Sequence, residues 1–200
     1  MVEKITQIDA QIPEDHGAHK GAVLLVYDPN TREFYPLAGD GVSGGVVTVD
    51  VAHAHIHEGE HYEANDYDDD VDIATPKWWL VYAAASGYSH LLPFAYATAN
   101  GLFEIFEGVE VSASGNQITP FNNNRNSSNT PNTEVYADPT ITASGVRLTV
   151  AIIGTDKGPA KAGGVSRESE IVLKSDTLYG FKFTAGSDNT GVTIGLAWYE

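Results

Sequence analysis

Strict alternation of apolar and polar residues near the C-terminus is the feature that most constrains the fold. Side chains at every second position of a strand share one face, so the pattern predicts two half-buried strands. Residues 186–191 between them are turn formers, and we expect the two strands to pair as a hairpin. The apolar sets are Tyr179, Phe181 and Phe183 in the first strand, and Val192, Ile194, Leu196 and Trp198 in the second.

The same alternation recurs upstream. Leu148, Val150 and Ile152 alternate with polar or small residues, which predicts a strand with one buried face. Residues 91–99 and 102–107 flank a favourable two-residue turn, and we expect them to form a second hairpin.

Residues 77–85 have two interpretations. Thr75-Pro76 could start a helix, but Trp78, Trp79 and the residues after them favour a buried strand. No segment has a convincing helical period, and Gly, Asn, Ser and Pro clusters separate the predicted strands. We therefore predict an all-β fold, an antiparallel β-sandwich of the jelly-roll type.

The first fifty residues differ from the rest. Residues 1–20 are polar and have no packing pattern, which predicts an extended N-terminal arm. Residues 21–50 are predicted to form a small β extension, and residues 51–200 the β-sandwich domain. The candidate strands of the extension are residues 22–27, 33–37 and 46–51.

Composition excludes several classes of protein. The chain has 27 acidic and 11 basic residues and a formal charge of -16, which disfavours nucleic-acid binding. It has no cysteine, so disulfides and thiolate zinc sites are excluded. No apolar stretch is long enough for a membrane helix, and no signal peptide is recognisable. We expect a protein made in a cytoplasm and not bound to membranes.

Histidines cluster at His53, His55 and His57. In a strand these side chains would share one face, continuing the row of Val49 and Val51. Imidazoles on one face are candidate ligands for zinc, nickel or copper, which leaves open a metal-binding β-barrel protein. The simpler interpretation is a histidine row at a sheet edge or subunit contact, hydrogen-bonded to nearby glutamates or backbone carbonyls. We expect no cofactor.

The acidic run from Asp66 to Asp72 resembles a calcium loop only superficially. An EF-hand loop starting at Asp66 needs glycine at its sixth position and glutamate at its twelfth, where this chain has Val71 and Lys77. A looser calcium site is one alternative. We expect a solvated acidic turn between strands.

No catalytic motif is present. The sequence has no nucleophile elbow, phosphate-binding glycine loop or His-Glu-x-x-His motif, so we expect no enzymatic activity. An asparagine-rich segment is more informative, because asparagine satisfies backbone groups through local turns. It predicts either an ordered loop or a flexible linker. Its candidate contacts to a partner protein are Asn122, Asn123, Asn124, Arg125 and Asn126.

Several motifs occur together in a recognisable order. They are His55-Ile56-His57-Glu58-Gly59, residues 102–108, residues 122–127, Gly163-Gly164, residues 170–174 and the terminal residues 196–200. In this order the chain resembles, over about residues 53–200, a family of structural proteins encoded beside the head genes of tailed bacteriophages. That family is associated with capsid decoration, also called cement.

The resemblance implies a β-sandwich that associates, as a trimer, on the outer surface of the capsid. Its partners would be the major capsid protein and further copies of itself, and its location the virion. The N-terminal arm and the loops at one end of the sandwich are the expected contact regions. The alternative is a tail or fibre component that recognises host glycans, with Trp78, Trp79 and Tyr88 as candidate stacking residues.

Overall fold

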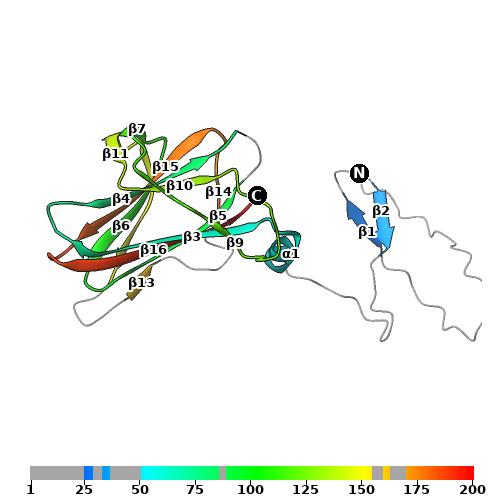
Figure 1. Cartoon of the computed structure of the whole chain (residues 1–200), viewed down its shortest axis with the longest axis horizontal. Coiled ribbons are helices and arrows are strands. Elements are labelled where there is room, and N and C mark those ends of the chain that lie inside the picture. Colours follow the sequence, from blue (N-terminus) through cyan, green and yellow to red (C-terminus); the bar gives the residue numbers. More distant parts are fainter. Residues whose placement is uncertain (1–24, 29–32, 37–50, 86–88, 155–159, 163–169) are drawn as a thin grey trace, which may run out of the picture. The chain divides into compact units, whose positions relative to one another are not determined.

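The computed structural model describes residues 25–28, 33–36, 51–85, 89–154, 160–162 and 170–200 (Figure 1). The chain divides into two compact units, Met1–Thr48 and Val49–Glu200. In the first, β1 (Leu25–Asp28) and β2 (Glu33–Pro36) pair antiparallel. These strands lie in the predicted β extension. The predicted arm and most of residues 46–51 lie outside the described residues.

The second unit is an antiparallel β-sandwich, as predicted. One sheet has the strand order β12-β6-β15-β4-β10-β8, and the other has the order β13-β5-β16-β3-β9, with β14 also paired to β5. Two short strands, β7 (Glu110–Ala113) and β11 (Thr140–Ala143), form a separate pair. The first sheet consists of β4 (Lys77–Ala83), β6 (Gly101–Glu107), β8 (Asn116–Ile118), β10 (Glu134–Ala137), β12 (Val146–Ile153) and β15 (Thr177–Ala185). The second consists of β3 (His61–Val71), β5 (His90–Ala97), β9 (Phe121–Asn122), β13 (Ala160–Ala162), β14 (Ile171–Val172) and β16 (Thr190–Tyr199).

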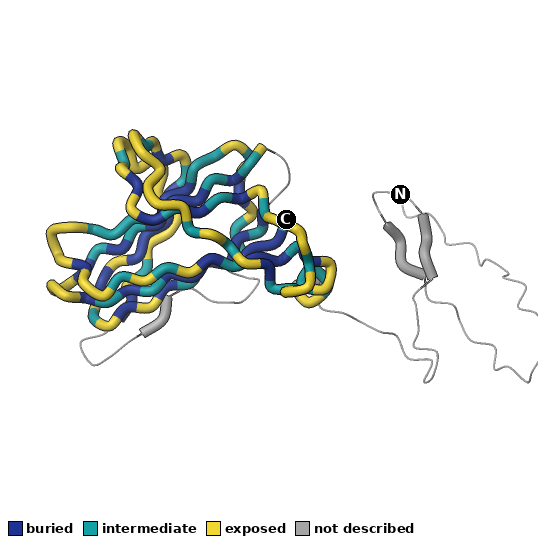
Figure 2. The backbone as a smooth tube through the Cα atoms, in the orientation of Figure 1, coloured by how far each residue is buried: buried dark blue, intermediate teal, exposed yellow. Residues whose placement is uncertain are grey.

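The core lies between the two sheets, and the predicted apolar faces supply it. Figure 2 shows the buried positions running along the strands of both layers. The alternating residues of β15 and β16 are at most 1% exposed, which confirms their predicted orientation. Trp79 of β4 is also fully buried, which confirms the predicted buried strand. A smaller cluster of Leu80, Phe106 and Val109 packs on the other face of the first sheet, with Val111 of β7 against it.

Both predicted hairpins are wrong. β15 pairs with β4 and β6, whereas its successor β16 pairs with β3 and β5 in the opposite sheet. Likewise β5 and β6 belong to different sheets. The two connections meet where Gly186 N donates to Asn100 O at 2.7 Å. The β15–β16 and β5–β6 connections each cross from one sheet to the other. The apolar faces of the connected strands nevertheless both point into the common core.

The buried face predicted for β12 is also wrong. Val146, Leu148, Val150 and Ile152 are 68, 45, 46 and 74% exposed. β12 is the end strand of its sheet, paired to β6 on one side. Ala151 and Ile153 pack on the core, whereas Ile152 pairs with exposed Leu102, so the strand turns its other face inward. Alternation alone does not show which face of an edge strand is buried.

Candidate functional site

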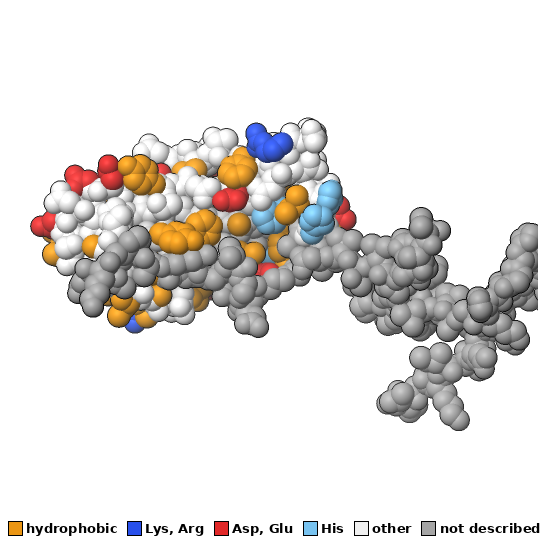
Figure 3. Space-filling view, turned by 90° about the horizontal axis from the view of Figure 1, so that it is seen from below, with side chains coloured by type: hydrophobic (Ala, Val, Ile, Leu, Met, Phe, Trp, Pro, Cys, Tyr) orange, Lys and Arg blue, Asp and Glu red, His pale blue; other side chains and the backbone are white. Residues whose placement is uncertain are grey.

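The three candidate histidines lie on a helix, not on the predicted strand. Helix α1 (Val51–Glu58) is at one end of the sandwich, beside β3 and β9 (Figure 1). At about 100° per residue, His53 and His57 share one side of the helix and His55 points to another. Figure 3 shows histidine side chains gathered at this end of the surface. The predicted row of imidazoles on one face therefore does not exist.

Helix α1 ends in a glycine cap. Gly59 has a φ of 76°, in the left-handed region that favours glycine. Its N–H donates to Ile56 O at 3.1 Å, and Glu60 N–H donates to His55 O at 2.9 Å. This pair of bonds is the Schellman motif, with Gly59 at C′ and Glu60 at C″. The turn reverses the chain into β3.

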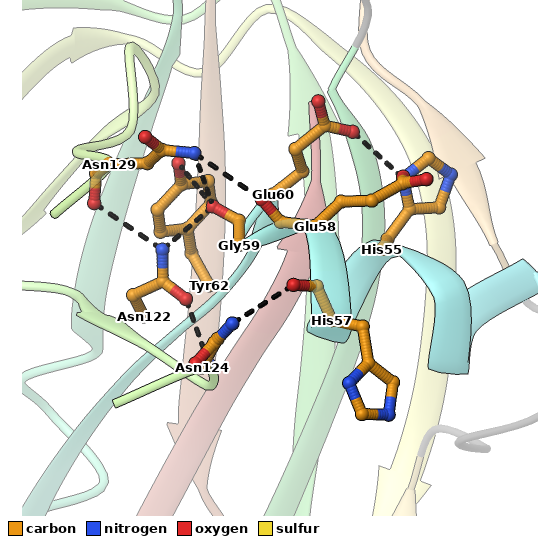
Figure 4. A network of polar contacts seen from close by, with 9 residues as sticks. All are labelled: His55, His57, Glu58, Gly59, Glu60, Tyr62, Asn122, Asn124 and Asn129. Carbon is orange, nitrogen blue, oxygen red and sulfur yellow. Dashed lines mark hydrogen bonds and ion pairs between the residues drawn. The ribbon is translucent and has the colours of Figure 1, made fainter. Parts of the chain in front are cut away.

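The asparagine-rich loop satisfies the carbonyls that the end of the helix leaves unpaired (Figure 4). Asn124 Nδ2 donates to His57 O at 3.0 Å. The Gly59 carbonyl accepts from Asn122 Nδ2 at 2.8 Å and from Asn129 Nδ2 at 3.2 Å. Each donor comes from more than sixty residues away in sequence. The loop is thus an ordered cap for α1, which excludes the flexible-linker interpretation.

Of the five predicted partner contacts, the asparagines at the start of the loop serve the chain itself. Asn122 is 9% exposed, and its Oδ1 accepts from Asn124 N at 2.9 Å. Asn123 hydrogen-bonds to His61. Arg125 and Asn126 are exposed, and the Arg125 guanidinium lies 5.9 Å from the Phe121 ring centroid.

His61 hydrogen-bonds to this loop. Asn123 Nδ2 donates to His61 Nδ1 at 2.8 Å, so that nitrogen acts as the acceptor and the ring proton is on Nε2. Burial lowers the pKa of His61; the nearby His55 acts in the same direction and Glu63 in the opposite one.

His55 lies between two carboxylates. Its Nδ1 is 3.0 Å from Glu60 Oε2 and 3.6 Å from Glu58 Oε2. Its ring stacks on Tyr199 at a centroid distance of 4.5 Å. His90 stacks on the same tyrosine, at 4.6 Å. The stack fixes the His55 ring, so this group of one imidazole and two carboxylates is the best-built candidate metal site among the described residues.

His53 and His57 form a second, simpler pair. Their Nε2 atoms are 2.9 Å apart and their rings meet edge to face at 4.6 Å. Both side chains are exposed. Histidines spaced four apart on a helix can chelate a metal ion through two nitrogens.

The acidic run is not the turn we expected. Asp66 to Asp70 belong to β3, and only Asp72 follows it. Asp66 accepts the indole N–H of buried Trp79 at 2.7 Å. Asp68 pairs with Lys77 at 3.1 Å. Two of the acids therefore have structural partners within the sandwich.

The glycan-stacking candidates do not form a platform. Trp79 is fully buried, Trp78 packs on Phe106 at 5.4 Å, and Tyr88 lies outside the described residues. Exposed aromatics occur on the other sheet, where Tyr67 and Tyr96 line a shallow depression. Sequence reasoning missed this pair because strand pairing alone brings the two tyrosines together.

Comparison with known proteins gives no relative. No protein-family model, no curated protein and no solved structure matches the chain. No helix among the described residues is long and apolar enough to cross a membrane.

Proposed function

We propose that this chain is a structural protein of a bacteriophage particle, a capsid decoration protein that binds the outer surface of the major capsid protein shell and stabilises it. The order of strands carries the proposal. Chain-consecutive strands alternate between the sheets from β3 to β6 and again from β8 to β10, with β16 between β3 and β5 and β15 between β4 and β6. This interleaving supports a jelly roll, a fold that recurs in viral capsid proteins.

The exposed row on β12 supports an associating protein. Val150 and Ile152 continue onto β6 through Leu102, which is 41% exposed and pairs with Ile152, and Val146 and Leu148 are exposed next to a β-bulge in the same strand. Isolated soluble domains rarely leave such a contiguous apolar strip in water. Glu104 of β6 lies beside this strip, but Arg147 at 2.9 Å and Lys182 at 3.4 Å balance its charge, so copies can meet there without strong repulsion. We assign the strip to self-association, as in the proposed trimer.

The sandwich offers contact surfaces rather than a reaction chamber. Two depressions of about 270 and 340 Å³ among its described residues open to solvent, and the amides of Asn122, Asn124 and Asn129 are committed to capping α1. Multivalent weak contacts on a lattice fit this design.

Copy number in purified virions tests the proposal. Quantitative mass spectrometry should give a ratio to the major capsid protein near one, or a simple fraction of one. Virions stripped of the chain should break at lower temperature than intact ones. A few copies per particle, or equal fragility, would refute the decoration role.

A tail or fibre component that binds host glycans is the second candidate. Tyr67 of β3 and Tyr96 of β5 each pair with Thr193 of β16, so the two rings flank a small residue. Tyr67 is 62% and Tyr96 39% exposed. Asp69 and Asn189 line the same depression of about 270 Å³ and offer hydrogen bonds to hydroxyls. Jelly rolls also occur in lectins. A low copy number together with binding on a glycan array that is lost in Tyr67→Ala would favour this function.

A further inference from the structure

The cap of α1 places metal-ligating side chains where a Schellman motif ordinarily has an apolar contact. In that motif the residues at C3 and C″ come together, and they are usually hydrophobic. Here C3 is His55 and C″ is Glu60, joined by the backbone bond from Glu60 N–H to His55 O at 2.9 Å. The same geometry holds the imidazole Nδ1 3.0 Å from the Glu60 carboxylate.

We propose that His55, Glu58 and Glu60 form a binding site for one divalent first-row transition-metal cation such as Zn²⁺. Imidazole nitrogen and carboxylate oxygen are ligands that these ions accept, and the remaining positions would be taken by water or a partner group. The three ligand atoms lie within 4.8 Å of one another.

The spacing of these atoms suits such an ion. A cation about 2.1 Å from each ligand holds neighbouring ligand atoms about 3 to 4 Å apart. The separations from His55 Nδ1, 3.0 Å to Glu60 and 3.6 Å to Glu58, fall in that range, and the cation would replace the proton of the hydrogen bond between His55 and Glu60. Glu58 is 60% exposed, so its side chain can rotate to close the set.

Two features prepare the site in advance. The His55 ring is stacked on Tyr199 with an interplanar angle of 13°, which limits its rotation. The Gly59 turn that positions Glu60 is held by Asn122 and Asn129 through the Gly59 carbonyl. Ligands fixed by surrounding contacts lose less freedom when a metal binds.

Charge favours a cation at this position. Two carboxylates beside one imidazole leave a local negative charge that a dication neutralises. The chain as a whole carries a formal charge of -16, which attracts cations and repels anions.

The His53–His57 pair is the competing metal site, and we expect it to bind a metal ion less tightly because it supplies two ligand atoms instead of three. It offers two nitrogens on an exposed helix face. The two sites lie on different sides of α1, so substitutions separate them.

Zinc titration of the full chain, cleared of metal with a chelator, tests the proposal. Calorimetry with Zn²⁺ alone should show one equivalent bound with micromolar affinity. Glu60→Gln and Glu58→Gln should each weaken binding by about 10-fold or more, and His55→Asn should abolish it. Each variant is checked by circular dichroism, and the two glutamine variants keep the shape of the residue that they replace.

Two controls define the result. Glu63→Gln removes a neighbouring charge from β3 without touching the site, and it should change the affinity by less than about threefold. The double variant His53→Ala/His57→Ala should also bind as the parent does. Absence of zinc binding by the parent up to millimolar concentration would overturn the proposal. Loss of binding in the double variant with retention in Glu60→Gln would also overturn it. Because the site is tested on purified protein, its failure leaves the virion measurements unaffected.

Discussion

Replacing Gly59 by alanine probes the join between α1 and the asparagine-rich loop. Gly59 has a φ of 76°, and a Cβ there would lie 2.3 Å from Ser127 Oγ and 2.6 Å from Ser127 Cβ. An alanine must therefore adopt the left-handed region and also displace the loop. We expect Gly59→Ala to destabilise the sandwich through both effects.

Gly108 is a matched control that separates the two costs. Its φ is 71°, and a Cβ at Gly108 would meet nothing within 4 Å. Gly108→Ala therefore reports backbone strain alone, about 1–2 kcal/mol. Gly59→Ala adds displacement of Ser127, which at the usual cost of overpacking contributes a further ~1–3 kcal/mol.

Urea unfolding measures both costs. With a slope of about 2 kcal/mol per molar urea, the midpoint of Gly59→Ala should fall by about 1 M or more, and that of Gly108→Ala by about half as much. Removing the obstacle with Ser127→Gly should return part of the loss in the double variant. Equal midpoints for the two alanine variants, or no coupling to Ser127, would show that the loop does not pack on Gly59.

Three further predictions concern the loop, the edge strand and one phenol. Asn122→Ala should lower the free energy of unfolding by about 1–2 kcal/mol, because the buried Gly59 carbonyl loses a donor. Asn126 is exposed, and Asn126→Ala should change the free energy of unfolding by less than ~0.5 kcal/mol. Equal losses for the two variants in urea unfolding would contradict the capping role. Ile152→Lys should reduce self-association, measured by analytical ultracentrifugation. Because Ile152 is 74% exposed, the substitution should not lower the stability of the monomer. An unchanged mass distribution would show that β12 is not part of the interface. The hydrogen bond to Glu134 raises the pKa of Tyr136 to about 12, so its stabilising contribution is complete below pH 10 and lost as the pH rises through 12. Ultraviolet titration should show one late-ionising phenol fewer in Tyr136→Phe than in the parent, and an unchanged titration curve above about pH 11 would refute the assignment.

The fold class and the buried faces of β15 and β16 could be predicted from the sequence because they depend on local alternation, whereas the same pattern gave the wrong face for β12. Phe181 and Ile194 alternate with small or polar neighbours, and each is buried as that pattern requires. Which strand lies alongside which could not be predicted. The apolar face of a strand is buried whether its connection to the next strand is a hairpin or a crossing to the opposite sheet. The two crossings are joined by a hydrogen bond from Gly186 N to Asn100 O, between residues far apart in sequence.

The candidate site shows the same limit on a smaller scale. Ala-His-Ala-His alternates with a period of two, so a strand explained it well, yet the chain forms a helix. The helix signals were present: Ala52 and Ala54 are strong helix formers, and Gly59 stands one residue past the end. The sequence does not show which distant amides stabilise so short a helix. They come from Asn122, Asn124 and Asn129, which donate to carbonyls at the end of the helix and its cap. The same cap brings Glu60 to His55. The wrong strand prediction and the proposed metal site therefore depend on the same helix end.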